Sequence, residues 1–304
     1  MNLCIAPSKY EQCVELAKNK NVYSLIIGYE NFSQATSCNL SSQQLIDLNK
    51  NKATKKIWVL INKMFFESEI NGLEKCLKFL WKIKVDKIIF SDYAVKQICD
   101  EKKIKIDLCY DGKTLNTNYG QLEFYKENDI TSIALSNELS YNEIKEISNN
   151  KNTVELMIQI EGLSLISFSR WKLLTNYMDH INSKDDLKYK KLFLKENERT
   201  LPNIIYENDI GTYIFSGYNL SLIEYFDKIL EMNIDYLKID GFLNDDAWLY
   251  KAIDTYSNAY KFIQNNKFTD YKSSLAEEIK KNNVEICSDG FFGSNYLHTR
   301  KENE

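Results

Sequence analysis

The chain has 304 residues, 44% of them hydrophobic, and a formal net charge of −4. This length and composition suffice for a domain with a full hydrophobic core, and no apolar run approaches the roughly 20 residues that a membrane-spanning helix needs. The first residues carry no basic, apolar leader, so we expect a cytoplasmic protein without membrane contact. The small negative charge gives no overall attraction to nucleic acid.

Cysteine and histidine usage argues against several kinds of site. The seven cysteines are scattered and contain no C-x-x-C pair, so we expect neither a disulfide framework nor a metal site, and most thiols should be buried. Only two histidines are present, His180 and His298, and we expect both at the surface. This inventory leaves few ways to build a histidine-based catalytic triad.

Short apolar runs alternate with helical patterns along the chain. Eight runs predict β-strands, at residues 3–6, 23–27, 57–61, 87–90, 104–108, 132–135, 154–160 and 236–239. Capping boxes mark helix starts at Ser8 with Glu11, Ser41 with Gln44, Ser140 with Glu143 and Ser221 with Glu224. A repeated order of strand, loop and capped helix indicates a parallel sheet, and eight units favour a TIM-like (β/α)8 barrel over an open doubly wound sheet.

The regular order breaks between the seventh and eighth predicted strands. We expect residues 1–265 to form the barrel, with an insertion at about 163–216, and residues 266–304 to form a C-terminal extension. The insertion holds an apolar, partly helical stretch (163–177), a charged stretch (184–199) and one extra strand (212–215). The charged stretch interleaves lysines and Arg199 with Tyr189 and Phe193, which is typical either of a solvated helix face or of an RNA-contacting surface.

Polar residues follow several of the predicted strands. The carboxyl ends of barrel strands meet at one rim, where carboxylates can act as acid, base or ligand. The candidate catalytic residues are Asp92, Asp111, Glu138, Glu161 and Asp240, and the candidate ligand-binding residues include Thr114, Asn116, Thr117, Asn118 and Tyr119. The alternative for each of them is a helix cap or a turn.

Several segments together resemble the collagenase-like peptidase family U32. The resembling stretches are 60–66, 89–94, 111–120, 135–140, 161–162 with 173–177, 237–241 and 288–292, in matching order over nearly the whole chain. Asn62, Asn176 and Lys238 lie within these stretches and are added as candidate ligand-binding residues. No single motif establishes the resemblance. It rests on all of these segments occurring together in the same order.

The chain also departs from the family pattern. Glu161 stands where a histidine is usual, and Leu165 and Trp171 or Lys172 stand where cluster-binding cysteines are expected. Asn137 replaces an arginine, and Cys109 replaces a histidine. Because an iron–sulfur cluster needs clustered thiolates, none is expected here. The chain therefore resembles the short, cluster-poor subgroup.

For that subgroup the resemblance implies a subunit that acts in 5-hydroxylation of the tRNA wobble uridine. Prephenate is then a candidate substrate, and a longer U32-family paralogue and tRNA are candidate partners. Two alternatives stay open. One is a U32-type peptidase or other hydrolase in which rim carboxylates hold a metal ion. The other is a non-catalytic barrel that stabilises a longer paralogue.

Overall fold

A closed ring of eight parallel strands forms the centre of the molecule. The computed structural model describes residues 1–195, 197 and 201–294. The ring strands are β1 (Leu3–Ala6), β2 (Ser24–Tyr29), β4 (Lys56–Ile61), β5 (Lys87–Phe90), β6 (Asp107–Tyr110), β7 (Ser132–Ala134), β8 (Glu155–Ser169) and β12 (Tyr236–Asp240). β12 pairs in parallel with both β1 and β8, which closes the ring. The predicted TIM-like (β/α)8 barrel with an insertion between its seventh and eighth strands is confirmed.

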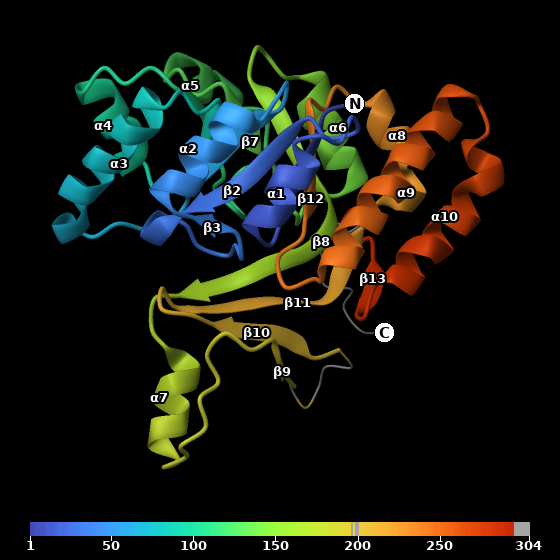
Figure 1. Cartoon of the computed structure of the whole chain (residues 1–304). Helices are drawn as coiled ribbons and strands as arrows, with labels where there is room; N and C mark the ends of the chain where they lie inside the picture. The colour runs from blue at the N-terminus through green and yellow to red at the C-terminus, as the bar shows by residue number, and fades with distance from the viewer. Residues whose placement is uncertain (196, 198–200, 295–304) are drawn as a thin grey trace, which may run out of the picture.

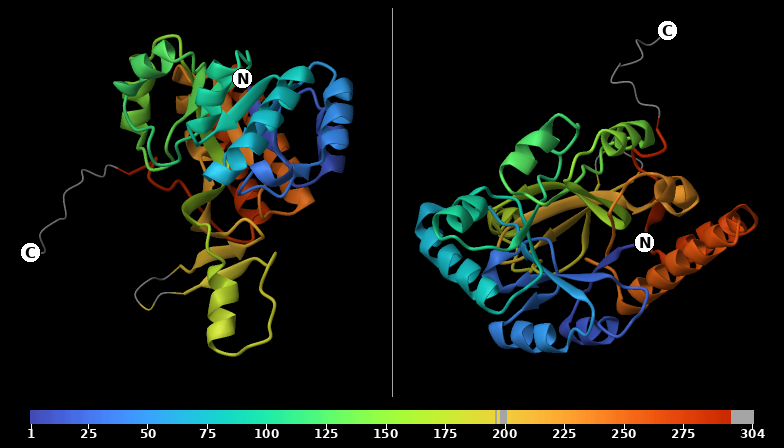
Figure 2. Two further views of the ribbon diagram at one scale, coloured as in Figure 1. Left: turned by 90° about the vertical axis from the view of Figure 1, so that its left-hand side faces the viewer. Right: turned by 90° about the horizontal axis from the view of Figure 1, so that it is seen from above.

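Helices cover the outside of the ring, as the view from above in Figure 2 shows. They are α1 (Tyr10–Leu16), α2 (Ser42–Asn51), α3 (Ile70–Lys82), α4 (Ala94–Glu101), α5 (Gln121–Glu127), α6 (Tyr141–Asn149), α8 (Phe226–Glu231), α9 (Asp246–Gln264) and α10 (Phe268–Asn282). Short 3-10 turns lie at Glu30–Phe32, Glu67–Glu69 and Ile223–Tyr225, and β3 (Asn39–Leu40) pairs with β2. The apolar residues at helical spacing in α3 are buried against the sheet, as their periodicity requires.

Two of the four predicted capping boxes are present. Ser41 caps α2 with Gln44, and Ser140 caps α6 with Glu143. The other two predictions are wrong. Lys9, not Ser8, precedes α1 and makes no side-chain cap, and Ser221 is the last residue of a strand. A serine can cap a helix only if its own backbone has left the preceding strand. Ser221 is still part of β11, where it pairs with Glu161.

The barrel interior is closed at the amino ends of the strands. There the Lys87 ammonium lies 4.8 Å from the ring centres of both Trp58 and Tyr236, and it donates to Ser132 Oγ (2.8 Å) and Glu155 Oε2 (3.0 Å). Above this group, apolar side chains such as Ile26 and Ile89 fill the ring. A hollow lined by this group and by lysines such as Lys56 and Lys82 lies outside it, and a separate cavity lies at the opposite end, at the carboxyl ends of the strands.

The insertion forms an antiparallel arm beside that open end, and Figures 1 and 2 show it projecting from the barrel. Its elements are the second half of β8, α7 (Leu173–His180), β9 (Leu192–Leu194), β10 (Asn203–Glu207) and β11 (Thr212–Ser221). β8 pairs with β11, β11 with β10, and β10 with β9, all antiparallel.

Parts of the insertion differ from expectation. The stretch at 163–177, predicted as partly helical, continues β8 as far as Ser169 and is helical from Leu173, where α7 begins. The described part of 184–199 holds β9 and no helix, so the solvated helix face is wrong there. The predicted extra strand at 212–215 is confirmed as the start of β11. Arg199 and His298 lie outside the described residues.

The C-terminal part returns to the arm. After α9 and α10, β13 (Ile286–Ser288) adds to β11 in parallel. Six of the seven cysteines are buried, as expected, and Cys287 is partly exposed. Within the described ranges, no helix is both long enough and apolar enough to cross a lipid bilayer.

Candidate functional site

A cavity of about 630 Å³ lies between the carboxyl ends of the barrel strands and the arm. Its barrel side is lined by Asn62 after β4, Asp111 and Lys113 after β6, Ser136 to Glu138 after β7, and Lys238 and Asp240 at the end of β12. Its arm side is lined by Leu163 and Leu165 of β8, Asn203 of β10, Phe215 of β11, and Phe242. The volume suits a small molecule or a single nucleobase.

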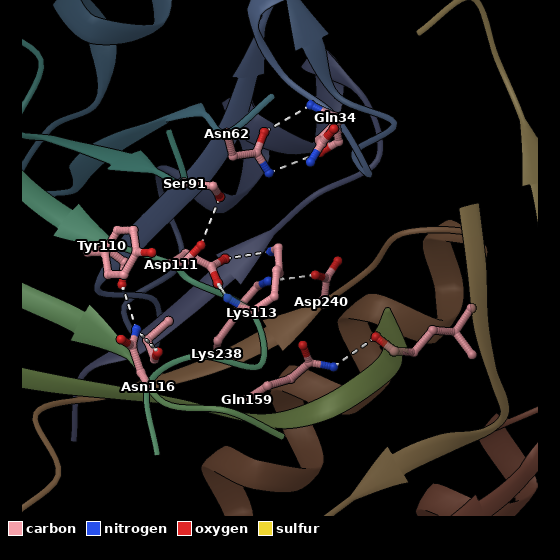
Figure 3. Close-up of polar contacts among 12 residues, drawn as sticks. Gln34, Asn62, Ser91, Tyr110, Asp111, Lys113, Asn116, Gln159, Lys238 and Asp240 are labelled. Carbon is pink, nitrogen blue, oxygen red and sulfur yellow. Dashed lines mark hydrogen bonds and ion pairs between the residues drawn. The ribbon is translucent and has the colours of Figure 1, made fainter. Parts of the chain in front are cut away.

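Four charged side chains meet at the floor of this cavity. Lys238 Nζ lies 2.7 Å from Asp240 Oδ2, and Lys113 Nζ lies 2.6 Å from Asp111 Oδ2. Lys238 and Asp240 are two residues apart on β12, so both side chains point into the barrel mouth. Figure 3 shows the two ion pairs facing each other. The floor therefore carries two cations and two anions.

The neighbouring charges shift the pKa values of Asp111 and Lys238. Burial by itself raises the pKa of Asp111, but the ammonium groups of Lys113 and Lys238 outweigh it and hold that pKa below its ordinary value. Burial lowers the pKa of Lys238, but the carboxylates of Asp240 and Asp111 outweigh it and raise that pKa above its ordinary value. Both pKa shifts keep Asp111 and Lys238 ionised at neutral pH.

Neutral polar side chains complete the barrel side of the cavity. The Asn62 amide exchanges two hydrogen bonds with the backbone of Gln34, at 2.9 and 3.2 Å, and so joins two loops at the rim (Figure 3). Gln159 Nε2 donates to the carbonyl of Leu163 at 3.0 Å, and Asn137 Nδ2 donates to Ser164 Oγ at 3.1 Å. These bonds hold β8 and the β7 loop against the cavity, and leave the Gln159 carbonyl oxygen available as an acceptor.

The arm side of the cavity is apolar and aromatic. Phe215 and Phe242 lie with ring centres 5.4 Å apart and belong to one buried cluster with Leu163, Ile204 and Tyr213. An apolar wall beside a charged floor suits a planar ring that carries polar edges, because the ring can pack against the apolar side chains while its edge groups form hydrogen bonds.

The structure brings six of the predicted site residues to this cavity: Asn62, Asp111, Thr114, Glu138, Lys238 and Asp240. Of these, Glu138 lies exposed at the rim. The strand-end argument works directly for Asn62, Asp111 and Asp240, which follow a parallel strand or end one. Thr114 and Glu138 lie in the loops after β6 and β7, and Lys238 lies within β12 on the same face as Asp240.

The remaining predicted residues lie elsewhere. Asp92 accepts from the backbone amides of Phe65 and Ala94, both at 2.9 Å, and thus shapes a turn. Asn116 is fully buried behind the cavity, where it bonds the carbonyls of Tyr110 and Ala134. Exposed loop positions outside the cavity lining hold Thr117, Asn118 and Tyr119, and Asn176 is exposed on α7.

Glu161 points away from the cavity. Gln159 pairs with Lys238 and Glu161 with Ile239, so Ile160 is an extra residue in the β8 to β12 ladder. This bulge turns Ile160 and Glu161 to the outer face, where Glu161 lies 3.1 Å from the Tyr256 hydroxyl of α9 and is fully buried. Burial, partly offset by hydrogen bonds, raises the pKa of Glu161 to about 8.

Sequence reasoning missed several cavity residues. Lys113 was overlooked although it lies between two predicted residues, and Gln159 although it is one of few polar residues in an apolar strand run. A polar residue inside a strand that is otherwise buried was a usable signal for Gln159. Nothing local marked Asn203, Phe215 or Phe242, because the arm brings them to the cavity from distant parts of the chain.

The available groups define what the site can do chemically. It offers paired ammonium and carboxylate groups for hydrogen bonding to a polar ligand, and an aromatic wall for stacking. Within the described ranges, no group of three or more His, Cys, Asp or Glu side chains is placed to hold a metal ion. Asp111 and Asp240 each engage a lysine.

The chain is similar in sequence to several known proteins. The tRNA hydroxylation protein P2 of Bacillus subtilis is 27% identical over 234 residues, which cover 76% of this chain and 75% of that protein. An uncharacterized protease of Methanocaldococcus jannaschii is 23% identical over 300 residues, covering 95% of this chain and 72% of that protein. The tRNA hydroxylation protein P1 of Bacillus subtilis is 23% identical over 260 residues, covering 83% and 61%. The model of peptidase family U32 matches residues 9–302, and the chain belongs to this family.

Proposed function

We propose that this protein is a cytoplasmic subunit for 5-hydroxylation of the wobble uridine of tRNA, and that its cavity holds the flipped uracil base. The observation that carries the proposal is the cavity itself, in which a charged floor faces an aromatic wall. Enzymes that modify a base take it out of the stack, hold its face against aromatic side chains and read its edge by hydrogen bonds. The names of the Bacillus subtilis relatives support hydroxylation of tRNA.

Individual residues have distinct roles in this proposal. The rings of Phe215 and Phe242, tilted by 48° to each other, form the apolar contact with the base. The Lys238 ammonium donates to a carbonyl oxygen of uracil, and the Gln159 carbonyl oxygen accepts from the ring N–H. Asp240, in ion-pair contact with Lys238, and Asp111 hold this ammonium in place through their charge.

Two further parts of the proposal concern other molecules. A longer U32-family paralogue supplies the redox chemistry as partner, and prephenate is the acid consumed in the reaction. The absence of clustered cysteines from this sequence supports the need for a partner, because the chain itself offers no set of thiolates for an iron–sulfur cluster.

Gene deletion with complementation tests the function. The gene is deleted in its native host, and wobble-uridine hydroxylation is measured by mass spectrometry of tRNA nucleosides. Deletion should abolish the modification, the wild-type gene should restore it, and Lys238→Met should restore roughly a tenth or less. Asp270→Asn, at an exposed carboxylate of α10, is the matched control and should restore it fully. Unchanged hydroxylation after deletion contradicts the proposal.

A further inference from the structure

The apolar wall of the cavity continues along the arm to an exposed edge. Leu165 pairs with Phe215, Phe215 with Ile204, and Ile204 with Phe193 across four antiparallel strands. Directly paired residues place their side chains on the same face of a sheet. Phe193, on the edge strand β9, therefore lies at the outer end of the row that lines the cavity, and its side chain is 58% exposed.

A second chain of aromatic rings leads the same way. From Phe242 in the cavity wall, ring centres lie 5.4 Å apart to Tyr206 and a further 6.5 Å apart to Tyr189. Tyr189 is 61% exposed, and its hydroxyl donates to Asp209 Oδ2 at 2.6 Å. Two exposed rings thus lie at the end of aromatic paths that begin in the cavity.

Positive charge surrounds these two rings. Residues 187–195 contain four lysines and no acidic residue, although Asp185 and Asp186 precede them and Glu196 and Glu198 follow them in the sequence. Lys188 pairs with Asp209, and Lys191 with Glu285. Lys190 and Lys195 are exposed and, within the part of the chain that the structure describes, have no carboxylate at ion-pair distance. They are available to neutralise an external anion.

We infer that the edge formed by Tyr189, Lys190, Phe193 and Lys195 is a docking surface for single-stranded RNA, and that it carries the nucleotides next to the base in the cavity. Alternating exposed rings and free lysines are what binds an unpaired strand, since rings stack on bases and ammonium groups contact phosphates. The free lysines favour RNA over an apolar protein surface as the occupant. The RNA-docking surface itself is argued from the arm alone. That the adjoining base in the cavity is the wobble uracil rests on the proposed function.

RNA affinity of the full chain tests this surface. The probe is a fluorescently labelled RNA hairpin with a single-stranded loop, and its dissociation constant is measured by anisotropy over a series of salt concentrations. The double variant Lys190→Ala/Phe193→Ala should bind roughly tenfold more weakly, with a shallower salt dependence because one phosphate contact is lost. Phe193→Trp retains a stacking ring and should bind as the wild type does.

The matched control lies on α5, on the side of the barrel away from the arm. Phe124 is 50% exposed and Lys126 pairs with Glu123, so Phe124→Ala/Lys126→Ala removes a ring and a charge from a surface that does not line the cavity. This control should leave hairpin affinity unchanged. Equal losses in both double variants, no loss in the arm variant, or no measurable binding by the wild type overturns the inference. Normal RNA affinity with lost co-purification of a paralogous protein overturns it in favour of protein docking.

The two proposals can fail separately. If gene deletion leaves hydroxylation intact while the arm variant still loses hairpin affinity, the proposed function fails and the RNA surface stands. If deletion abolishes hydroxylation and the arm variant binds the hairpin normally, the RNA surface fails alone.

Discussion

Lys238 is the residue on which the cavity floor depends. Its side chain is 15% exposed, and it lies between the carboxylates of Asp240, which it contacts at 2.7 Å, and Asp111. A largely buried ammonium is stable only when anions compensate for its lost hydration, and the carboxylates need it for the same reason. The two groups must therefore be considered together when either is changed.

Removing this ammonium should destabilise the fold measurably. We expect Lys238→Met to lower the free energy of unfolding by roughly 3 kcal/mol, because it leaves Asp240 buried without its cation. It should also raise the pKa of Asp111, since Lys238 contributes to holding that pKa down. Urea denaturation and NMR titration of the Asp111 carboxyl measure the two effects. Introducing Asp240→Leu into the Lys238→Met variant should recover part of the lost free energy of unfolding. If the double variant instead loses the sum of both single losses, Lys238 and Asp240 are not energetically coupled.

Glu161 makes stability depend on pH in an unusual direction. Its pKa is about 8 in the folded chain and near 4.3 in an unfolded one, so the folded state binds the extra proton between these values. Its contribution to stability is complete below about pH 4.3 and is lost as pH rises toward 8, at about 1.4 kcal/mol per pH unit. Glu161→Gln should remove this loss, so that the variant gains on the wild type between pH 5 and pH 8. Thermal unfolding across that range measures it, and parallel curves contradict it.

At the scale of elements, α7 depends on a carboxylate from another strand. Glu207 of β10 is fully buried, and it accepts from the amides of Leu174 (2.8 Å) and Thr175 (3.1 Å) in the first turn of α7. A carboxylate at this end satisfies free N–H groups and opposes the positive end of the helix dipole. Glu207 thus fastens α7 to the sheet of the arm.

Neutralising this cap should loosen α7 without unfolding the barrel. Glu207→Gln should reduce the protection of the α7 amides by roughly 1 to 2 kcal/mol, as judged by hydrogen exchange. Burial raises the pKa of Glu207, but its hydrogen bonds outweigh that effect and lower it, so the wild-type cap is lost as pH falls through this depressed pKa. Asp209→Asn, on the same hairpin turn, is the control and should leave α7 protection intact.

Elements with a regular period were predictable, and irregular ones were not. Seven of the eight barrel strands begin within about two residues of the start of the predicted apolar run, because buried parallel strands are apolar on both faces. The fifth run, at 104–108, starts three residues before β6 because Ile104 and Ile106 belong to the connection. The β8 continuation was missed although Leu163, Ser164 and Leu165 alternate as a strand does.

The candidate site was predictable only in part for a related reason. Strand ends locate Asp111 and Asp240 directly, but they cannot show the bulge at Ile160 that sends Glu161 to the outer face. They also cannot show that Phe215, some fifty residues beyond β8's barrel portion, returns to the mouth. Long-range pairing decides both, and a single sequence does not contain it in readable form.

At the scale of the whole molecule, the C-terminal segment ties the arm to the barrel. β13 pairs with β11, and Phe292 packs between the rings of Tyr141 on α6 and Tyr225. Phe292 is 3% exposed, whereas its neighbour Phe291 is 44% exposed and lines the cavity. Adjacent phenylalanines therefore serve packing and cavity shape separately.

This division predicts opposite outcomes for two neighbouring substitutions. Phe292→Ala should lower the free energy of unfolding by roughly 3 kcal/mol, because a buried ring is replaced by a void. Phe291→Ala should change it by less than about 1 kcal/mol. Chemical denaturation of both variants provides the measurement. Similar losses in the two would show that the segment does not pack as described.

The paired charges at the cavity floor have a consequence for which guests can enter. Two lysines and two aspartates cancel, so an uncharged heterocycle can settle on them while both couples stay intact. A singly charged ligand would have to break one of the two ion pairs, or its own charge would stay uncompensated in a poorly hydrated cavity. The floor therefore discriminates by formal charge before shape is considered, and neutral uracil meets that condition.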